Sequence, residues 1–351
     1  MGSCEANHAA VGKAHHRMHV LNAVSALARA VDDRIGFNRL YFVISLLIIA
    51  VALVTLARLL HDIDFDKVVA AVQATTPSTI LLAGILVAAG YATLTLYDYF
   101  ALRTIGRRNV PYPIAALASF TSYSIGHNLG ATVFTGGAVR LRIYSAWGLG
   151  IIDVAKIAFV TGLTFWLGNA FVLGLSMAYA PEAASVVDQL PPWLNRSIAL
   201  AGLATIVGYI LWLLPGPRLV GYGEWQVTLP SAPLTFVQIG IGVADLTIGA
   251  LAVYVLLPAE PAIDFPALLV AFVLATLLGF VSHAPGSLGV FDVLMLVGLV
   301  QFDRNELVAS LLVFRALYFI LPFCLALCAL SARELWLNLS VEPGPPRPPA
   351  A

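Results

Sequence analysis

Charged residues are scarce in this chain of 351 residues. Asp, Glu, Lys and Arg together make up 11% of it, whereas hydrophobic residues make up 60% and the mean hydropathy is +0.90. A soluble globular domain carries roughly 25% charged residues, because its surface must be hydrated. The composition therefore excludes an ordinary soluble protein and indicates a polytopic membrane domain, in which lipid replaces water around most of the chain.

The sequence also has no excess of positive or negative charge, and too few cysteines for a set of disulfide bonds. Its formal net charge at pH 7 is zero, so no overall basic field points to nucleic acid as a partner. Of its three cysteines, Cys324 and Cys328 fall within an apolar segment, where we expect them to pack as small hydrophobic side chains. We expect no disulfide, metal site or cofactor.

The chain divides into three parts by composition. Residues 1–39 are polar and lack the apolar core and cleavage site of a secretory signal peptide, so we expect a cytoplasmic N-terminal arm. Residues 40–331 contain the long apolar segments and are assigned to one transmembrane domain. Residues 332–351 are predicted to form a cytoplasmic tail, which is rich in proline over residues 343–351.

The apolar segments fall into two classes by length. A transmembrane helix needs about 20 residues. Six segments fit one helix each: 40–60, 77–101, 154–179, 194–214, 233–257 and 307–331. The other two, 113–148 and 266–301, are longer and are interrupted near the middle by Gly, Pro, Asn or His. We therefore predict an all-α fold with about six full transmembrane helices and two broken helical hairpins, which either re-enter the membrane or cross it fully.

Loop charges orient these segments, because cytoplasmic loops are enriched in Lys and Arg. Arg103, Arg107 and Arg108 follow the second apolar segment. Acidic residues occur instead in three other loops: 62–66, 180–191 and 258–265. Both observations are met if the first broken segment opens toward the cytoplasm and the second toward the outside. Both termini are then cytoplasmic.

Two broken segments that open to opposite faces indicate an inverted repeat. A short shared pattern supports this weakly, since His127-Asn128-Leu129-Gly130 lies in the first segment and His283-Ala284-Pro285-Gly286 in the second. Non-helical backbone at membrane depth is tolerated only where protein or water satisfies it, so the breaks predict a polar cavity. We expect the two hairpins to meet near the middle of the membrane.

Charged groups inside apolar segments are the candidates for function. Each costs about 2.5–3.5 kcal/mol on insertion scales, so such residues mark a pathway or a paired site. The residues that meet this criterion are Asp98, His127, Arg140, Arg142, Asp245, Asp292 and Arg315. His283 is added to them as a titratable neighbour.

Arg140 and Arg142 end a run that contains Gly136 and Gly137. A guanidinium group binds a phosphate through two hydrogen bonds, and glycine lets backbone N–H groups approach the same oxygens. The run therefore predicts a lipid-phosphate site. In the alternative interpretation, both arginines reach the cytoplasmic headgroups as topology anchors.

The remaining charged residues suggest ion pairs or proton carriers. Arg315 lies too deep in its segment to reach the headgroups, and Asp292 is its expected partner, in a structural pair or a transport site. Asp98, near the cytoplasmic end of its segment, can receive an arginine or a cationic headgroup, or stand at the interface without a partner. Asp245 and His283 are candidate proton carriers.

Several of these residues lie in stretches with a familiar pattern: Tyr97–Leu102, Ser119–Gly130, Thr135–Tyr144, Ser282–Asp292, and Arg315 followed by Pro322. These stretches resemble the transmembrane region of the lysylphosphatidylglycerol synthase family, also described as a flippase-like domain. The similarity covers about residues 40–331. The family usually carries Asn where His127 stands, Gly where Ser287 stands and Glu where Asp292 stands.

The resemblance implies translocation of a lipid or a lipid-linked molecule. In bifunctional relatives, this domain translocates aminoacylated phosphatidylglycerol made by a cytoplasmic aminoacyl-transferase domain that follows it. This chain stops at Ala351 with no room for that domain, so we expect no synthase activity. The predicted substrate-binding residues are Asp98, Asn128, Gly136, Gly137, Arg140, Arg142, Asp292 and Arg315.

The leading hypothesis is a transporter of a phosphate-bearing lipid in the bacterial inner membrane, either a phospholipid or an aminoacylated phosphatidylglycerol. No ATP-binding loop is visible, so we expect downhill or ion-coupled movement. Homo-oligomers are also expected. One alternative is a membrane scaffold for a separate lipid-modifying enzyme. The other is a membrane-embedded enzyme that transfers or hydrolyses a headgroup, with His283 as base and Asp292 orienting it.

Overall fold

The computed structural model describes residues 65–216, 218–221 and 226–340. The chain divides into two units, residues 1–51 and 52–351, and the described residues all belong to the second unit. The expected N-terminal arm, the apolar segment 40–60 and the proline-rich end of the chain lie outside the described residues.

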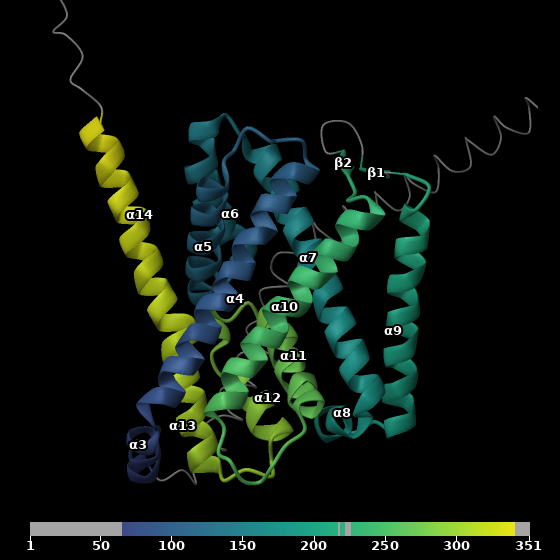
Figure 1. The fold of residues 1–351 in the computed structure, drawn as a ribbon, viewed down its shortest axis with the longest axis vertical. Coiled ribbons are helices and arrows are strands. Elements are labelled where there is room, and N and C mark those ends of the chain that lie inside the picture. Colours follow the sequence, from purple (N-terminus) through teal and green to yellow (C-terminus); the bar gives the residue numbers. More distant parts are fainter. Residues whose placement is uncertain (1–64, 217, 222–225, 341–351) are drawn as a thin grey trace, which may run out of the picture. The chain divides into compact units, whose positions relative to one another are not determined.

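The described part is helical apart from one small β-hairpin (Figure 1). Its longer helices are α4 (Pro77–Thr104), α5 (Tyr112–Leu129), α7 (Ile151–Tyr179), α9 (Pro192–Leu213), α10 (Ala232–Leu256), α11 (Phe265–Ser282) and α14 (Leu321–Ser340). The shorter helices are α3 (Phe65–Ala74), α6 (Thr132–Tyr144), α8 (Pro181–Asp188), α12 (Val290–Gly298) and α13 (Arg304–Arg315). Two 3₁₀ turns, η1 (Ser145–Trp147) and η3 (Pro285–Ser287), and one π-helix, η4 (Ala316–Ile320), complete the helical elements. Strands β1 (Leu219–Val220) and β2 (Val227–Thr228) pair antiparallel, with Leu219 opposite Thr228.

Six helical runs in the described residues are long and apolar enough to cross a membrane: α4, α7, α9, α10, α11 and the continuous run Arg304–Arg333. Five of them match segments predicted as single helices, and α11 is the first arm of the second broken segment. The predicted all-α membrane fold is thereby confirmed. Helix α14 continues beyond residue 331, through the start of the predicted tail, because residues 332–340 contain no Pro or Gly to end it.

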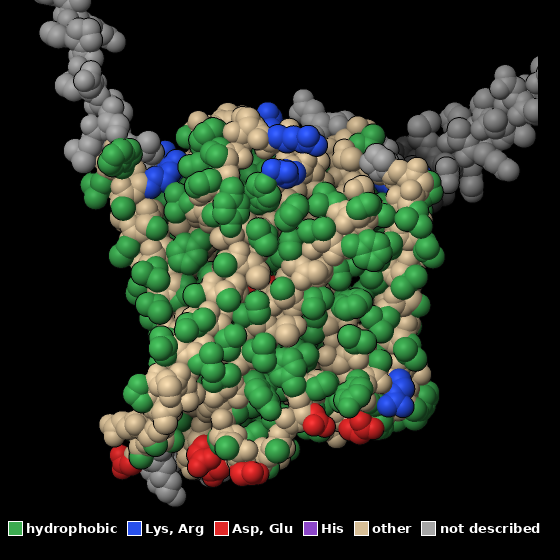
Figure 2. All heavy atoms as spheres, viewed as in Figure 1, with side chains coloured by type: hydrophobic (Ala, Val, Ile, Leu, Met, Phe, Trp, Pro, Cys, Tyr) green, Lys and Arg blue, Asp and Glu red, His purple; other side chains and the backbone are tan. Residues whose placement is uncertain are grey.

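The outside of the bundle is apolar along its flanks and charged at its ends (Figure 2). Large apolar side chains such as Leu81 and Phe134 are 66% and 78% exposed. Lys and Arg gather at the end that carries β1 and β2, and Asp and Glu at the end that carries α3 and α8. Cys324 and Cys328, expected to pack inside, are exposed, because α14 lies at the edge of the bundle and presents one face outward.

Both broken segments form helical hairpins. Helices α5 and α6 pack against each other and are joined at Gly130 and Ala131, whose φ angles are 74° and 45°. Helices α11 and α12 also pack together and are joined by residues 283–289. Four residues of this second turn have positive φ: His283, Gly286, Ser287 and Gly289. The hairpins enter from opposite ends of the bundle, and their turns lie between these ends (Figure 1).

The two hairpin turns touch each other at Gly130. A Cβ atom at this position would lie 2.5 Å from the carbonyl oxygen of His283 and 3.1 Å from the backbone nitrogen of Pro285. Gly130 also has a backbone conformation, φ 74° and ψ −179°, that is essentially restricted to glycine. Both the conformation and the contact therefore require glycine here, and the expected meeting of the two hairpins is observed.

Helices α7 and α10 cross closely beside these turns. A Cβ atom at Gly168 would lie 2.6 Å from the Cα atom of Gly242, so only glycine allows the two backbones to approach this far. The crossing brings Phe165, one turn before Gly168, and Asp245, one turn after Gly242, to the same cavity.

Candidate functional site

An open cavity of about 850 Å³, counting the solvent space at its mouth, lies where the two hairpin turns meet α4, α7, α10 and η4. The turns contribute His127, Gly130, Ala131, Thr132, His283, Ala284 and Ser287. Aromatic rings form most of the remaining wall: Tyr97, Tyr123, Phe165, Phe272, Phe280, Phe291, Phe314, Tyr318 and Phe319. A cavity is therefore present at the helix breaks and both turns contribute to it, but its wall is mostly apolar, whereas the sequence predicted a polar one.

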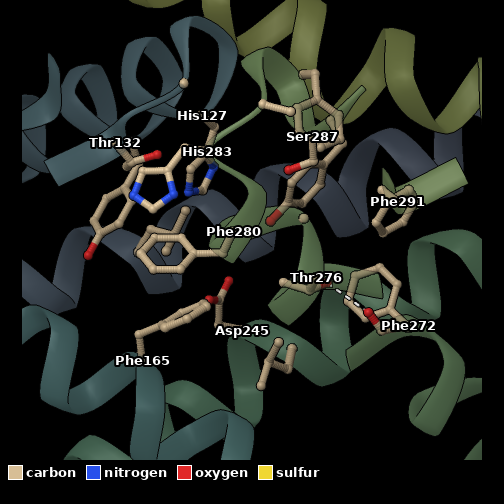
Figure 3. Close-up of a pocket in the computed structure, with 18 of the residues that line it drawn as sticks. His127, Thr132, Phe165, Asp245, Phe272, Thr276, Phe280, His283, Ser287 and Phe291 are labelled. Atoms are coloured by element: carbon tan, nitrogen blue, oxygen red, sulfur yellow. Dashed lines mark hydrogen bonds between the residues drawn. The ribbon is translucent and has the colours of Figure 1, made fainter. Parts of the chain in front are cut away.

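Asp245 supplies the carboxylate of this cavity. The Tyr97 hydroxyl donates a hydrogen bond to its Oδ2 atom at 3.3 Å. In Figure 3 the carboxylate points into the cavity, toward Phe280. Within the described part of the chain, no Lys or Arg side chain lines the cavity. Asp245 is therefore the acidic group of a cavity wall in which no described Lys or Arg side chain faces it.

His127 and His283 reach the cavity from different hairpins (Figure 3). His127 lies in the last turn of α5, with its ring centroid 5.6 Å from that of Tyr123. His283 ends α11 in a left-handed conformation, and its Nδ1 atom lies 2.8 Å from the carbonyl oxygen of Val281. Each histidine precedes by three residues a glycine with positive φ, Gly130 or Gly286. The shared His-x-x-Gly pattern therefore marks both turns.

Asp98 and Arg140 form a buried ion pair between α4 and α6. Arg140 donates from Nε to Oδ2 at 2.9 Å and from Nη2 to Oδ1 at 2.8 Å. The Tyr144 hydroxyl donates to the same carboxylate at 2.8 Å, and the guanidinium carbon lies 4.9 Å from the centroid of the Tyr123 ring. The two side chains are 0% and 5% exposed. An arginine, one of the predicted partners of Asp98, is therefore what it binds, with the full hydrogen bonding that a buried ion pair needs.

The structure does not bring Arg140 and Arg142 to one site, contrary to the sequence prediction. Arg142 is exposed whereas Arg140 is buried, because residues two apart on a helix point to different sides. Gly136 faces α5, where a Cβ atom would lie 3.0 Å from the Ser122 carbonyl oxygen, and Gly137 faces open space. Binding of a phosphate by these residues stays a prediction.

The second ion pair joins Arg315, at the end of α13, to Asp292 in α12, as predicted. Arg315 donates from Nε to Oδ1 at 2.7 Å and from Nη2 to Oδ2 at 2.6 Å. Its Nη1 atom donates to the Gly286 carbonyl oxygen at 3.0 Å, and Asp292 accepts from the Gly289 N–H at 3.1 Å. The pair therefore satisfies polar backbone atoms of the second hairpin turn.

These contacts also bear on the proposed headgroup-modifying enzyme. Asp292 is bound to Arg315 and to the Gly289 backbone, and His283 contacts the Val281 carbonyl oxygen. The structure therefore does not assemble His283 and Asp292 as a base and its orienting carboxylate.

Asn128 connects the first hairpin turn to the π-helix η4. Its Nδ2 atom donates to the carbonyl oxygens of Ser124 at 2.8 Å and of Phe319 at 3.0 Å. Because it bonds backbone on both sides, its observed role is to hold the turn, and a contact with substrate stays a prediction.

The sequence prediction missed η4, although Pro322 was a signal for it. Proline lacks the N–H group that would donate to the carbonyl of the residue four positions earlier, which here is Tyr318. The helix widens into a π-helix over residues 316–320, and the Tyr91 hydroxyl donates to the Tyr318 carbonyl oxygen at 2.9 Å. π-helical turns of this kind are frequent at functional sites, and this one places Tyr318 and Phe319 in the cavity wall.

Comparison with known proteins found three informative relatives, while no family model matches the chain. An uncharacterized protein of Synechocystis sp. is 28% identical over 279 residues, which is 79% of this chain and 86% of that protein. The inner membrane protein YbhN of Escherichia coli is 24% identical over 274 residues, 76% of this chain and 83% of YbhN.

The third relative is the phosphatidylglycerol lysyltransferase of Bacillus subtilis. It is 28% identical over 251 residues, which is 67% of this chain but 27% of that protein. The chain is similar to all three. These similarities agree with the resemblance drawn from the motifs, at the level of a membrane protein related to YbhN and to part of a lysyltransferase.

Proposed function

We propose that the protein translocates a phosphate-bearing lipid, of the phospholipid or aminoacylated phosphatidylglycerol class, across the bacterial inner membrane. The contact between the two hairpin turns at one cavity, which holds Asp245 and two histidines among aromatic rings, carries this proposal. Broken helices that meet in the middle of an inverted repeat are the usual binding sites of secondary transporters. The names of two relatives support it, since one is an inner membrane protein and the other acts on phosphatidylglycerol.

In this proposal, the basic end of the bundle faces the cytoplasm, because cytoplasmic loops are enriched in Lys and Arg. The first hairpin then re-enters the membrane from the cytoplasm and the second from the outside. Both chain termini are cytoplasmic.

The lipid headgroup occupies the cavity while its acyl chains stay in the bilayer. Apolar side chains at the hairpin turns are exposed and suit contact with acyl chains, as at Leu129, which is 56% exposed, and Leu288, which is 55% exposed. Movement of either hairpin away from the other would open the cavity to one side. Asp245 and His283 line the cavity and are the proposed proton carriers if transport is ion-coupled.

The test is lipid translocation in proteoliposomes. The purified protein is reconstituted with acyl-labelled phospholipids, and label accessible on the outside is followed by chemical quenching. Thr276→Trp fills the cavity and should slow translocation at least about tenfold, since a blocked site binds no headgroup. Thr205→Trp, on the exposed side of α9, is the matched control and should translocate like the parent protein.

Other outcomes would replace the proposal. Lipid movement no faster than in protein-free vesicles for every lipid tested, together with co-purification of a lipid-modifying enzyme, would favour the scaffold. A chemically altered lipid, seen by thin-layer chromatography, would favour an enzyme. Association with a second copy of the chain stays a prediction that cross-linking in the membrane can check.

A further inference from the structure

The charges around the cavity indicate which kind of headgroup it suits. Asp245 places a carboxylate in the wall. Arg140 and Arg315, the arginines of the two buried ion pairs, are bound to Asp98 and Asp292 and do not line the cavity. A headgroup with a negative charge alone would meet a carboxylate and no neutralising cation, at a depth where an uncompensated charge is costly.

Aromatic rings surround this carboxylate. Phe165 and Phe280 line the cavity together with Asp245 (Figure 3). The Tyr97 hydroxyl donates to the Oδ2 atom of Asp245. An ammonium group is attracted to the faces of aromatic rings, and the attraction grows when water is excluded. A carboxylate among aromatic rings is therefore a suitable receptor for an ammonium group.

The hairpin turns differ from the Asp245 side of the cavity, because they present groups that can contact an anion. His127 and His283 present imidazole rings and Ser287 presents a hydroxyl, whereas the Thr132 hydroxyl donates to the Gly126 carbonyl oxygen at 3.2 Å. Helix α6 begins at Thr132, so the positive end of its dipole also faces the cavity. In Figure 3, Phe280 lies between Asp245 and the two histidines. The start of a helix, the Ser287 hydroxyl and two imidazole rings are thus present on one side of the cavity and a carboxylate on the other.

The geometry points to the headgroup of a zwitterionic aminophospholipid, such as phosphatidylethanolamine, with its ammonium group at Asp245 and its phosphate at the hairpin turns. This assignment rests on the proposed function and deepens it by naming the substrate class. Phosphatidylglycerol carries the phosphate without an ammonium group, so it leaves Asp245 without a counter-charge.

The experiment compares acyl-labelled phosphatidylethanolamine with acyl-labelled phosphatidylglycerol in the same vesicles. The parent protein should move the ethanolamine lipid about tenfold faster or more, as a lost hydrogen bond to a charged group implies. Asp245→Asn should remove most of this preference by slowing the ethanolamine lipid and not the glycerol lipid. Glu260→Gln, an exposed carboxylate changed in the same way, should leave both rates unchanged.

The results separate this inference from the proposed function. If neither lipid moves, and labelled aminoacylated phosphatidylglycerol in the same vesicles does not move either, the proposed function is overturned. Equal movement of both lipids, or equal slowing of both by Asp245→Asn, overturns the substrate class alone. Labelled glycerophosphoethanolamine tests a soluble occupant, and its uptake without lipid movement would also overturn the lipid assignment. Thermal unfolding of Asp245→Asn in detergent verifies that the variant is folded.

Discussion

The two hairpins solve the same physical problem in different ways. Each places non-helical backbone inside an apolar bundle. There, each unpaired N–H or C=O group costs roughly several kcal/mol, because it has left water for an apolar medium. The first turn is short, at Gly130 and Ala131, and packs against the other turn. The second spans residues 283–289, and Arg315 satisfies the Gly286 carbonyl oxygen.

The two ion pairs also differ, both in the elements that they join and in their exposure to solvent. Asp98 and Arg140 hold α6 to α4 and are sealed from solvent, with side chains 0% and 5% exposed. Asp292 and Arg315 hold the second turn itself and are 14% and 11% exposed. We infer that the first pair serves mainly the stability of the bundle, while the second controls the conformation of a turn that borders the cavity.

Breaking the first pair should have the largest effect on stability. Arg140→Ala leaves the Asp98 carboxylate buried with the Tyr144 hydroxyl but without its counter-charge, and removal of one partner from a buried pair costs about 3–5 kcal/mol. Thermal unfolding in detergent measures the loss. Arg142→Ala, at the exposed neighbouring arginine, is the control and should change the unfolding temperature little. An Arg140→Ala protein as stable as the parent would contradict the importance given to this pair.

Breaking the second pair should reduce global stability less than breaking the first. Its effect on backbone motion should be confined to the second hairpin turn. Arg315→Ala removes the bonds to Asp292 and to the Gly286 carbonyl oxygen, at a cost of about 2 kcal/mol or more. Amide hydrogen exchange should rise in residues 283–289 and stay nearly unchanged in α5 and α6. Equal increases in both hairpins would show that the pairs do not act separately.

The sequence predicted most of this arrangement because its signals are local. Apolar runs of spanning length, interruptions by Gly and Pro, and the Arg315–Asp292 pair all follow from what a charged or non-helical group costs in a membrane. Asp245 was identified in the same way. The interpretation of Arg140 as a phosphate ligand came from a local run, whereas its partner Asp98 lies on another helix.

The remaining features depend on which helices become neighbours, which local patterns do not specify. The cavity wall combines rings from separate elements, such as Phe165 of α7 and Phe319 of η4. The close α7–α10 crossing rests on Gly168 and Gly242, two glycines far apart in sequence. The π-helix η4 had a local signal in Pro322, but its tethers from Tyr91 and Asn128 come from other helices.

The most local expected effect concerns the first turn and tests whether glycine alone maintains it. Gly130→Ala forces a Cβ atom against the His283 carbonyl oxygen in a conformation that costs a non-glycine residue about 1–3 kcal/mol. Gly137→Ala is the matched control, because that glycine is helical and faces open space, so alanine there should stabilise α6 by about 0.5–1 kcal/mol. Opposite shifts in unfolding temperature are therefore expected from the same substitution seven positions apart in the sequence. If both variants gained stability, the turns would not be pressed together at Gly130, and the first hairpin would owe its position to the Asp98–Arg140 pair instead.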